Sequence, residues 1–404
     1  MTELSVLFVT ARFPLPLLSG DRNRAFHQLR WLSQRHRVTL VTHADKHHTA
    51  PAQALLEQQG VRVITVPFSR ARAAMRIAKA VLTSDLPLQT ALYNSSAARE
   101  TVRSLLESER FDLAHIQLAR TVPLLDAHAD LPRVVDLIDA LSLNMQRRAD
   151  HDRGWLRWAA RMDAARLQRY ERMICEDAGA ALVVASPDRD AIGPYPSLHI
   201  VPNGVDVTEF PYVPAFRDPH QLVFTGNLGY FPNIDAVSWF VDHVLPLVWQ
   251  EEPEARLTIA GARPARRIQA YGQRDSRITV AGDVAHLHPV LAGARLAVAP
   301  MRAGSGQLLK VLEAMSTGTP VVTTTRGLSG IDAVPGQDLL VADTPAAFAA
   351  HVVSLIRDNR LSARLSSAGR QLVERLYTWE RSAADLERIY LKVLACATTA
   401  ARSA

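Results

Sequence analysis

The 404-residue sequence contains few of the residues that mark secreted, metal-binding or fibrous proteins. Its two cysteines, Cys175 and Cys396, are too few for a disulfide framework, and their spacing matches no metal site. Hydrophobic residues make up 48% of the chain, charged residues 21% and aromatic residues 6%. These proportions exclude a disordered or fibrous chain. They indicate a globular protein. The two cysteines are expected to pack as small apolar side chains in a reducing compartment.

Long hydrophobic runs are also absent. No run reaches the roughly 18 apolar residues that a membrane-spanning helix needs. The apolar run at 4–9 has the length of a strand and follows an acidic residue rather than a basic cluster, so it does not resemble a signal peptide. We therefore expect a cytoplasmic protein.

A large excess of charge of one sign is lacking as well. Lys and Arg number 46 and Asp and Glu number 40, which gives a net charge of +6. This excess is small for a chain of this length, and no basic face interleaved with aromatic residues is present. We therefore expect no nucleic-acid partner.

Hydrophobic, β-branched runs alternate with amphipathic stretches through the first half of the chain. The runs lie at 5–10, 37–42, 61–66, 111–116, 133–138 and 180–186. They lack polar alternation, which is typical of strands buried on both faces of a parallel sheet. Helical stretches between them include 21–35, 95–109 and 155–177. This order predicts a doubly wound α/β domain.

The same pattern starts again after a proline-rich segment at 192–219. The second series predicts strands at 221–226, 255–261, 277–282, 295–300, 319–324 and 338–343, and helices at 234–250, 284–292, 307–317 and 345–358. The chain is also too long for one ordinary core. We therefore predict two similar α/β domains, 1–195 and 196–378, and a final helix within 379–404 that packs back on the first domain.

The loop after the strand at 295–300 is the best candidate for a ligand site. It has a Gly-Ser-Gly sequence and leads into a helix that is expected to begin near Gln307. Gly304 and Gly306 let a ligand approach the backbone closely, and free N–H groups at the helix start favour an anion such as a diphosphate. Lys310 and Glu313 lie near one helix face, where a carboxylate suits the hydroxyls of a ribose. An ordinary glycine-rich helix start with a solvated Lys–Glu pair explains the same residues.

Several motifs in combination resemble the retaining family-4 glycosyltransferases of the GT-B fold. They are VPNGVD at 201–206, VFTGNLGYFPN at 223–233, LTIAG at 257–261 and the segment 299–322, and the resemblance covers nearly the whole chain. Within that family the sequence is similar to the exosortase-associated sugar transferases of bacterial exopolysaccharide clusters. The resemblance implies two Rossmann-like domains facing across a cleft. It also implies an acceptor on the N-terminal domain, a nucleotide-diphosphate sugar on the C-terminal domain, and no metal or other cofactor.

The resemblance assigns roles to the residues of the glycine-rich loop. Glu313 is the second acid of the family's E-x7-E motif, the acid that binds ribose hydroxyls. Ser305 replaces the first acid, which contacts the donor sugar. A hydroxyl can hydrogen-bond a sugar, but it has no charge to stabilise a developing oxocarbenium ion. Backbone groups of the loop are expected to hold the diphosphate or the sugar: Gly304, Gly306, Gln307 and Leu308.

A second departure concerns the first loop of the donor domain, which begins at Gly226. Many family members place an arginine and a lysine in this loop, whereas this sequence has Asn227 and Asn233. We expect Gly226 and Asn227 to lie at the donor, and Lys310 or Arg302 to neutralise the diphosphate. Asn233 is explained equally well as the N-cap of the helix that follows.

In the N-terminal domain the resemblance points to the loop after the first strand. Gly20 is expected to let this loop approach the donor phosphate and the acceptor. Arg22 and Arg24, at the start of the next helix, are candidates to supply positive charge. A surface loop with solvated arginines is the alternative.

Two other strand ends carry candidate residues. Gln117 occupies the position of the family's histidine near the sugar, while His115, two residues earlier, is better explained as a packed core residue. Asp139 and Asp136 end another strand and are candidates for acceptor contact, although capping of the next helix is an equal explanation. The candidate catalytic residues are therefore Ser305, Gln117 and Asp139.

Most of the net charge lies at 147–172, which holds eight arginines and four acids. Trp155 and Trp158 lie beside these charges, as in an amphipathic helix with a basic side. Such a helix predicts peripheral contact with an anionic membrane or a lipid-linked acceptor. A solvated arginine-rich face, packed on the sheet through its apolar stripe, is the alternative.

The sequence as a whole predicts a metal-independent glycosyltransferase of the hexosyltransferase type. It would move a sugar from a nucleotide-diphosphate sugar to a saccharide or lipid-linked saccharide, with retention, in bacterial exopolysaccharide biosynthesis at the inner face of the cell membrane. Two alternatives remain open. One is an epimerase-like enzyme that acts on the donor alone, and the other is a non-catalytic binding or scaffold protein.

Overall fold

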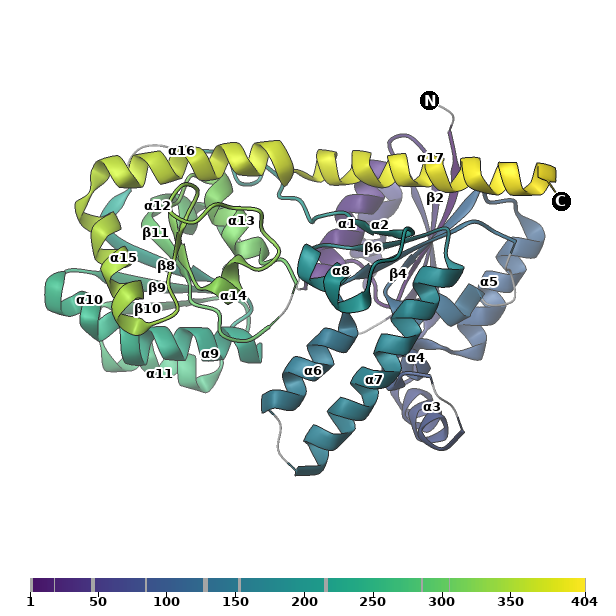
Figure 1. The fold of residues 1–404 in the computed structure, drawn as a ribbon, viewed down its shortest axis with the longest axis horizontal. Helices are drawn as coiled ribbons and strands as arrows, with labels where there is room; N and C mark the ends of the chain where they lie inside the picture. The colour runs from purple at the N-terminus through teal and green to yellow at the C-terminus, as the bar shows by residue number, and fades with distance from the viewer. Residues whose placement is uncertain are drawn as a thin grey trace. The chain divides into compact units, whose positions relative to one another are not determined.

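The computed structural model describes residues 3–17, 19–44, 48–83, 86–125, 130–151, 154–213, 217–284, 286–304 and 306–403. The chain divides into two compact units (Figure 1). Unit 1 comprises Met1–Pro202 and Ser382–Ala404, and unit 2 comprises Asn203–Arg381.

Unit 1 is built on a seven-stranded sheet in the order β3-β2-β1-β4-β5-β6-β7. Its strands are β1 (Ser5–Thr10), β2 (Arg37–Ala44), β3 (Val61–Pro67), β4 (Leu113–Gln117), β5 (Arg133–Ile138), β6 (Ala180–Val183) and β7 (Leu198–Ile200). All neighbouring strands are parallel, and β4 and β6 are buried along their whole length. The absence of polar alternation in the sequence follows from this burial on both faces.

Helices connect the strands of unit 1. They are α1 (Gly20–Leu32), α2 (Ala50–Gln58), α3 (Arg70–Thr83), α4 (Leu88–Tyr93), α5 (Ser96–Ser108), α6 (Leu141–His151), α7 (Gly154–Asp177) and α8 (Ser186–Ile192). A short 3-10 helix at Ala119–Leu125 follows β4. Strand β7 lies within the proline-rich segment 192–219, and the sequence analysis names no strand there. A three-residue edge strand is too short to produce a hydrophobic pattern.

Unit 2 is built on a six-stranded parallel sheet in the order β10-β9-β8-β11-β12-β13. Its strands are β8 (Asp218–Thr225), β9 (Arg256–Gly261), β10 (Ile278–Gly282), β11 (Ala294–Ala299), β12 (Val321–Thr323) and β13 (Leu340–Val341). Its helices are α9 (Phe231–Trp239), α10 (Leu245–Glu251), α11 (Arg266–Arg274), α12 (His288–Gly293), α13 (Leu309–Ser316), α14 (Thr325–Leu328), α15 (Pro345–Arg357) and α16 (Asn359–Leu376). A π-helical turn at Phe240–Val244 joins α9 to α10.

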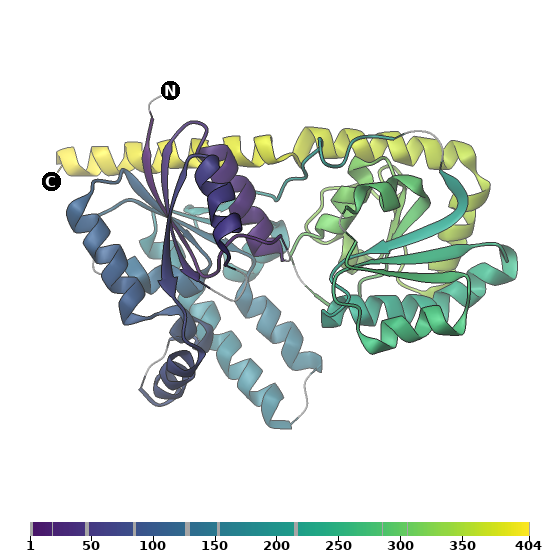
Figure 2. The ribbon, with the colours of Figure 1, turned by 180° about the vertical axis from the view of Figure 1, so that it is seen from behind.

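The last helix, α17 (Trp379–Ser403), begins in unit 2 and continues through unit 1 from Ser382. Within unit 1, Leu386 and Tyr390 of α17 are fully buried in one hydrophobic cluster with Phe8 of β1. The Ser382 hydroxyl donates to the carbonyl of Pro202 at 2.6 Å. Figure 2 shows this helix, in yellow, crossing the strands of unit 1. These residues therefore complete the core of unit 1.

The two sheets place the candidate residues of each unit near one edge of its sheet. Parallel strands all end at the same edge, so the loops after β1, β4 and β5 meet in unit 1. The loops after β8, β11 and β12 meet in the same way in unit 2. Among the described helices, none combines the length and the hydrophobicity that a membrane span requires.

Candidate functional site

The loop after β11 carries two glycines with positive φ. Gly304 has φ +105° and Gly306 has φ +70°, conformations that side chains other than glycine rarely adopt. Ser305, the candidate catalytic hydroxyl between them, lies outside the described residues. Helix α13 begins at Leu309, two residues later than the sequence predicts, because Leu308 is still extended as the N-cap. The first N–H groups of α13 have no partner within their own helix and favour an anion at the helix start.

The Gln307 side chain is buried in this loop with 8% exposure. Its Oε1 accepts the backbone N–H of Asn203 at 2.8 Å. Because that partner is a donor, the amide oxygen has to face it, and the orientation of the amide follows. Its Nε2 has no hydrogen-bond partner among the described residues. A buried amide donor without a partner is costly, so this group is available to an acceptor oxygen of a ligand.

Lys310, in the first turn of α13, contacts the loop that follows β8. Its Nζ donates to Asn233 Oδ1 at 2.7 Å and lies 4.0 Å from the centre of the Phe224 ring. Gly226 has φ +148°, and a Cβ at this position would lie 2.8 Å from the Lys310 Nζ. Burial lowers the pKa of the lysine to about 7, although Glu313 opposes the shift. The structure thus brings together Gly226, Asn233 and Lys310.

Glu313 lies one turn further along α13 and is half-buried. Burial raises the pKa of its carboxyl to about 7, Glu209 raises it further, and Lys310 lowers it. A carboxylate and an ammonium that both titrate near neutrality lie side by side on one helix. Such an arrangement is common at ligand sites because burial shifts both groups toward the pH of the cell.

Asn233 does not cap helix α9, so that alternative was wrong. The helix begins at Phe231, with Tyr230 as its N-cap, and Asn233 lies in the first turn. Its Nδ2 donates to the carbonyl of Asn227 at 2.9 Å. The Asn227 side chain accepts the N–H of Gly229 at 3.1 Å. Both asparagines therefore shape the loop, and Asn233 also holds Lys310.

Arg302, the second cation that the sequence proposes for a diphosphate, is engaged elsewhere. Its guanidinium pairs with both carboxylate oxygens of Asp235, at 2.6 and 3.1 Å. This ion pair offsets its positive charge. Arg326, which the sequence analysis missed, donates from Nη1 to the carbonyl of Gly304 at 3.3 Å. Its position directly after a strand next to the glycine-rich loop was the signal that could have identified it.

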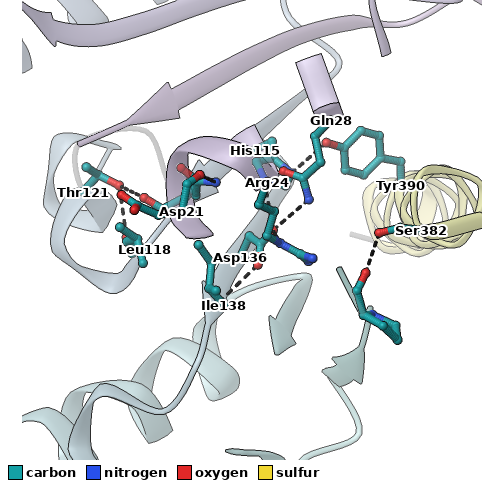
Figure 3. A network of polar contacts seen from close by, with 12 residues as sticks. Asp21, Arg24, Gln28, His115, Leu118, Thr121, Asp136, Ile138, Ser382 and Tyr390 are labelled. Atoms are coloured by element: carbon teal, nitrogen blue, oxygen red, sulfur yellow. Dashed lines mark hydrogen bonds and ion pairs between the residues drawn. The ribbon is translucent and has the colours of Figure 1, made fainter. Parts of the chain in front are cut away.

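Arg24 of unit 1 is fully buried, so the structure contradicts its predicted place at a phosphate. Its Nε is 2.6 Å from Asp136 Oδ2, and neither side chain is exposed (Figure 3). Gln28 donates to the same oxygen at 2.9 Å, and Asp136 Oδ1 accepts the N–H of Ile138. Asp136 is therefore a core ion-pair partner rather than an acceptor contact. The arginine is buried because β5 places a carboxylate behind α1.

His115 belongs to the same buried network. Its Nδ1 is 2.7 Å from the Tyr390 hydroxyl of α17, its Nε2 is 3.8 Å from Asp136, and its ring stacks on Phe8 at 4.2 Å. Burial lowers the pKa of this histidine to about 4, although Asp136 opposes the shift. His115 is therefore a packed core residue, as the sequence analysis favours.

The remaining candidates of unit 1 lie at its strand ends. The side chain of Gln117 is 2% exposed and donates to the carbonyl of Asp21 at 3.1 Å. Asp139 is partly exposed and accepts from Asn144 at 2.6 Å. Gly20 is the exposed first residue of α1, and a Cβ there would meet nothing within 4 Å. Arg22, in contrast, is buried and donates to the carbonyl of Leu15 at 3.0 Å.

Metal binding has no candidate in the described part of the chain. These residues include no group of three or more His, Cys, Asp or Glu side chains that could hold a metal ion. The polar groups of the unit 2 site are instead an amide, a lysine, a carboxyl group and backbone N–H groups. This set suits an anionic ligand that also carries hydroxyl groups.

Residues 219–358 match the family model described as glycosyl transferases group 1. Among curated proteins, an uncharacterised 44.6 kDa protein of the Klebsiella pneumoniae cps region is 29% identical over 141 residues, 33% of this chain and 36% of that protein. The glycogen synthase of Mycobacterium tuberculosis strain H37Rv is 30% identical over 206 residues, 48% of each chain. The chain thus spans less than half the length of these curated relatives.

Solved structures match over nearly the whole chain. Anabaena HepE in complex with UDP has a TM-score of 0.65 and 14% identity, and the match covers 95% of this chain and 99% of HepE. The sucrose-phosphate synthase of Thermosynechococcus elongatus has a TM-score of 0.70 and 16% identity, with 97% and 99% covered. Identities this low establish the fold alone. The chain has the GT-B fold, and residues 219–358 of its second unit are similar to the group 1 glycosyl transferases.

Proposed function

We propose that the protein is a glycosyltransferase that moves a sugar from a nucleotide-diphosphate sugar to a saccharide or lipid-linked saccharide. The group 1 domain supports this proposal, and the HepE structures contain UDP and UDP-glucose. The relative from a cps region supports a role in exopolysaccharide biosynthesis. Transfer of a hexose, retention of the anomeric configuration and independence of metal are proposed from the sequence motifs.

One observation carries the proposal: the residues expected at the donor meet at the end of β11. Lys310 and Glu313 lie on α13 directly after the glycine-rich loop, and Gly226 leaves the space that the lysine occupies. We assign Lys310, the N–H groups at the start of α13 and the backbone of Gly306 and Leu308 to the diphosphate. Glu313 is assigned to the ribose hydroxyls.

Two further groups of the loop are assigned to the phosphates or the sugar. The Gln307 amide has a buried N–H without a partner among the described residues, so it is placed to donate to a ligand oxygen. Ser305 retains the assignment to the donor sugar from its sequence position. Gln117 and Asp139 are retained as candidates on the acceptor side, since both lie at the carboxyl ends of strands.

The reaction needs no strong base from the protein. The acceptor oxygen forms a bond to the anomeric carbon as the bond from that carbon to the β-phosphate oxygen breaks. The nucleoside diphosphate leaves with the bonding electron pair, and its β-phosphate takes the proton of the acceptor hydroxyl. The N–H groups at the start of α13 and the lysine stabilise the charge that develops on the phosphate. The protein contributes mainly position and electrostatics.

A panel of nucleotide diphosphates and their sugars tests this function. A ligand at 100 times its dissociation constant stabilises a protein by about 2.7 kcal/mol, so the matching donor is expected to raise the melting temperature by several degrees. With that donor and a saccharide acceptor, the protein is expected to release nucleoside diphosphate at the same rate with and without a chelator. NMR of the product then reports the anomeric configuration.

Three results of that experiment would contradict the proposal. Turnover of the donor without an acceptor would indicate an epimerase-like enzyme. Binding without any release of nucleoside diphosphate, across the acceptors tried, would indicate a non-catalytic protein. Inversion at the anomeric carbon would contradict retention alone and leave the transfer reaction intact.

The basic segment 147–172 adds a proposed membrane contact. It covers the end of α6 and most of α7, which lie side by side in unit 1 (Figures 1 and 2). Leu167 and Tyr170 of α7 are buried in the core, so the apolar stripe packs on the sheet. Trp158 is nevertheless 67% exposed, beside the exposed Arg157 and Arg161. We propose that this exposed end of α7 binds the anionic inner face of the cell membrane.

Flotation with liposomes tests this contact. The wild type is expected to float with vesicles that contain anionic lipid and to stay behind with neutral ones, in a salt-dependent way. A variant with Trp158→Ser, Arg157→Gln and Arg161→Gln is expected to lose flotation. A control with Leu55→Ser and Arg62→Gln, both at exposed positions of unit 1, is expected to retain it. Equal flotation of both variants would contradict the contact.

A further inference from the structure

Three side-chain hydrogen bonds join the end of β12 and the loop after it to the end of β11 and the loop after it. They run from Thr323 Oγ1 to the Ala299 carbonyl at 2.8 Å, from Thr324 Oγ1 to the Met301 carbonyl at 2.5 Å, and from Arg326 Nη1 to the Gly304 carbonyl at 3.3 Å. The three acceptors follow one another along the β11 loop toward the candidate donor site. The last bond places a guanidinium at the first glycine of that site.

The backbone around Arg326 is held firmly in place. Thr324 caps α14 by accepting the N–H of Gly327 at 3.0 Å, and Thr325 bonds Asp343 through both its N–H and its hydroxyl. A Cβ at Gly327 would lie 2.0 Å from Thr323 Oγ1, so α14 packs directly against the strands. The arginine therefore projects from a rigid turn and not from a loose loop.

Arg326 differs from Arg302 in its electrical surroundings. Arg302 forms a two-pronged ion pair with Asp235. Arg326 is exposed, and within the described part of the chain no carboxylate lies at ion-pair distance from it. Its contact with Gly304 uses a neutral acceptor and one of the five N–H donors of a guanidinium. The positive charge of Arg326 is therefore available to an external anion.

The candidate donor site needs such a charge. A nucleoside diphosphate carries at least two negative charges, and the loop after β8 offers Asn227 and Asn233 where a cation is expected. The Lys310 ammonium already donates a hydrogen bond to Asn233, and the neighbouring Glu313 offsets part of its charge. An arginine stays protonated at any physiological pH and can bind two phosphate oxygens at once.

We propose that Arg326 binds the diphosphate of the nucleotide sugar and supplies the positive charge that the loop after β8 lacks. This inference rests on the proposed function and adds a residue to it. On binding, the guanidinium exchanges its long contact with the Gly304 carbonyl for phosphate oxygens. The strength of a charge-assisted bond relative to a neutral one drives this exchange.

Calorimetric titration of paired variants tests the assignment. The probes are UDP, GDP, ADP and dTDP, each with its monophosphate and its nucleoside. For the diphosphate that the wild type binds, Arg326→Gln is expected to weaken affinity by about tenfold or more, as for a lost hydrogen bond to a charged group. The affinity for the monophosphate is expected to fall less, and the affinity for the nucleoside is expected to stay unchanged. Arg302→Gln is the matched control and is expected to change each affinity less than about twofold.

The outcomes separate this inference from the proposed function. Unchanged diphosphate affinity in Arg326→Gln, or an equal loss for diphosphate and nucleoside, would overturn the role of Arg326 and leave the proposed function intact. No binding of any diphosphate by the wild type would overturn both. Arg326→Lys keeps the charge without the two-pronged geometry and is expected to bind with intermediate affinity. This variant also decides the matter if Arg326→Gln does not fold.

Discussion

Near the carboxyl ends of the two sheets, the buried arginine of unit 1 and two cations of unit 2 have different hydrogen-bond partners. Unit 1 encloses Arg24 and Asp136 together with no exposed surface, so each charge is cancelled by a partner of the opposite sign. Unit 2 places Lys310 against a neutral amide and Arg326 against a neutral carbonyl. A cancelled charge contributes to the fold, whereas a cation with neutral partners can still attract an anion. The contrast separates a structural network from a binding site within one chain.

Removing one half of the buried pair in unit 1 is expected to produce the largest effect. Arg24→Met leaves Asp136 buried without its cation, which costs about 3–5 kcal/mol in the free energy of unfolding. Denaturant unfolding followed by circular dichroism measures this loss. Arg62→Met breaks the exposed pair with Glu109 and is expected to cost less than about 1 kcal/mol. Similar losses in the two variants would show that Arg24 is not a structural residue.

Removing the charge of Glu313 is expected to act on binding rather than on the fold. If the carboxylate accepts the ribose hydroxyls, Glu313→Gln weakens the affinity for the donor nucleotide by about 1.5–3 kcal/mol. Inorganic pyrophosphate, which has no ribose, is expected to bind as before. Calorimetry with both ligands checks this, and Glu374→Gln on the exposed end of α16 is the control. An equal loss for pyrophosphate would contradict the ribose assignment.

The lowered pKa of Lys310 predicts a pH dependence of binding. The lysine pKa is about 7, so its ammonium form is lost as the pH rises through neutrality, and diphosphate affinity is expected to fall with it. The fall is at most about tenfold per pH unit, or 1.4 kcal/mol. Titrations between about pH 6 and pH 9 measure this profile.

Lys310→Arg provides the matched control for that profile. Its side chain stays charged over the same range, so the fall in affinity that comes from the lysine is expected to be absent. The pH dependence that remains in the variant comes from Glu313, whose pKa is also about 7. Parallel profiles for the wild type and the variant would show that Lys310 does not hold the diphosphate.

The contact between α17 and the unit 1 network is expected to give the smallest effect. Tyr390→Phe removes the hydroxyl that bonds His115 at 2.7 Å, at a cost of about 0.5–1.5 kcal/mol. Thermal unfolding measures the change. Tyr195→Phe, whose hydroxyl makes a long exposed contact with Glu176, is expected to have no measurable effect. If Tyr390→Phe weakened ligand binding without lowering stability, this network would belong to the ligand-binding site instead.

Hydrophobic patterns predict the fold well because buried parallel strands need apolar side chains on both faces. The candidate donor loop is predictable for a related reason: two glycines between a strand and a helix form a local signal. Arg24, Arg302 and Arg326 are different. In the sequence each is an arginine beside a glycine-containing loop or a helix start, and no local pattern shows which one has an acidic partner.

By itself, the sequence determined two series of strands, the glycine-rich turn before α13, and the order of Lys310 and Glu313 on one helix. Each depends on residues within a few positions of one another, where spacing and chain stiffness decide the outcome. Only the tertiary structure decided which arginines have their charge offset by an acidic partner. Asp136 is 112 residues from Arg24, and Asp235 is 67 residues from Arg302. Such pairs form only when the sheets bring distant segments together, because electrostatic attraction depends on distance in space and not along the chain.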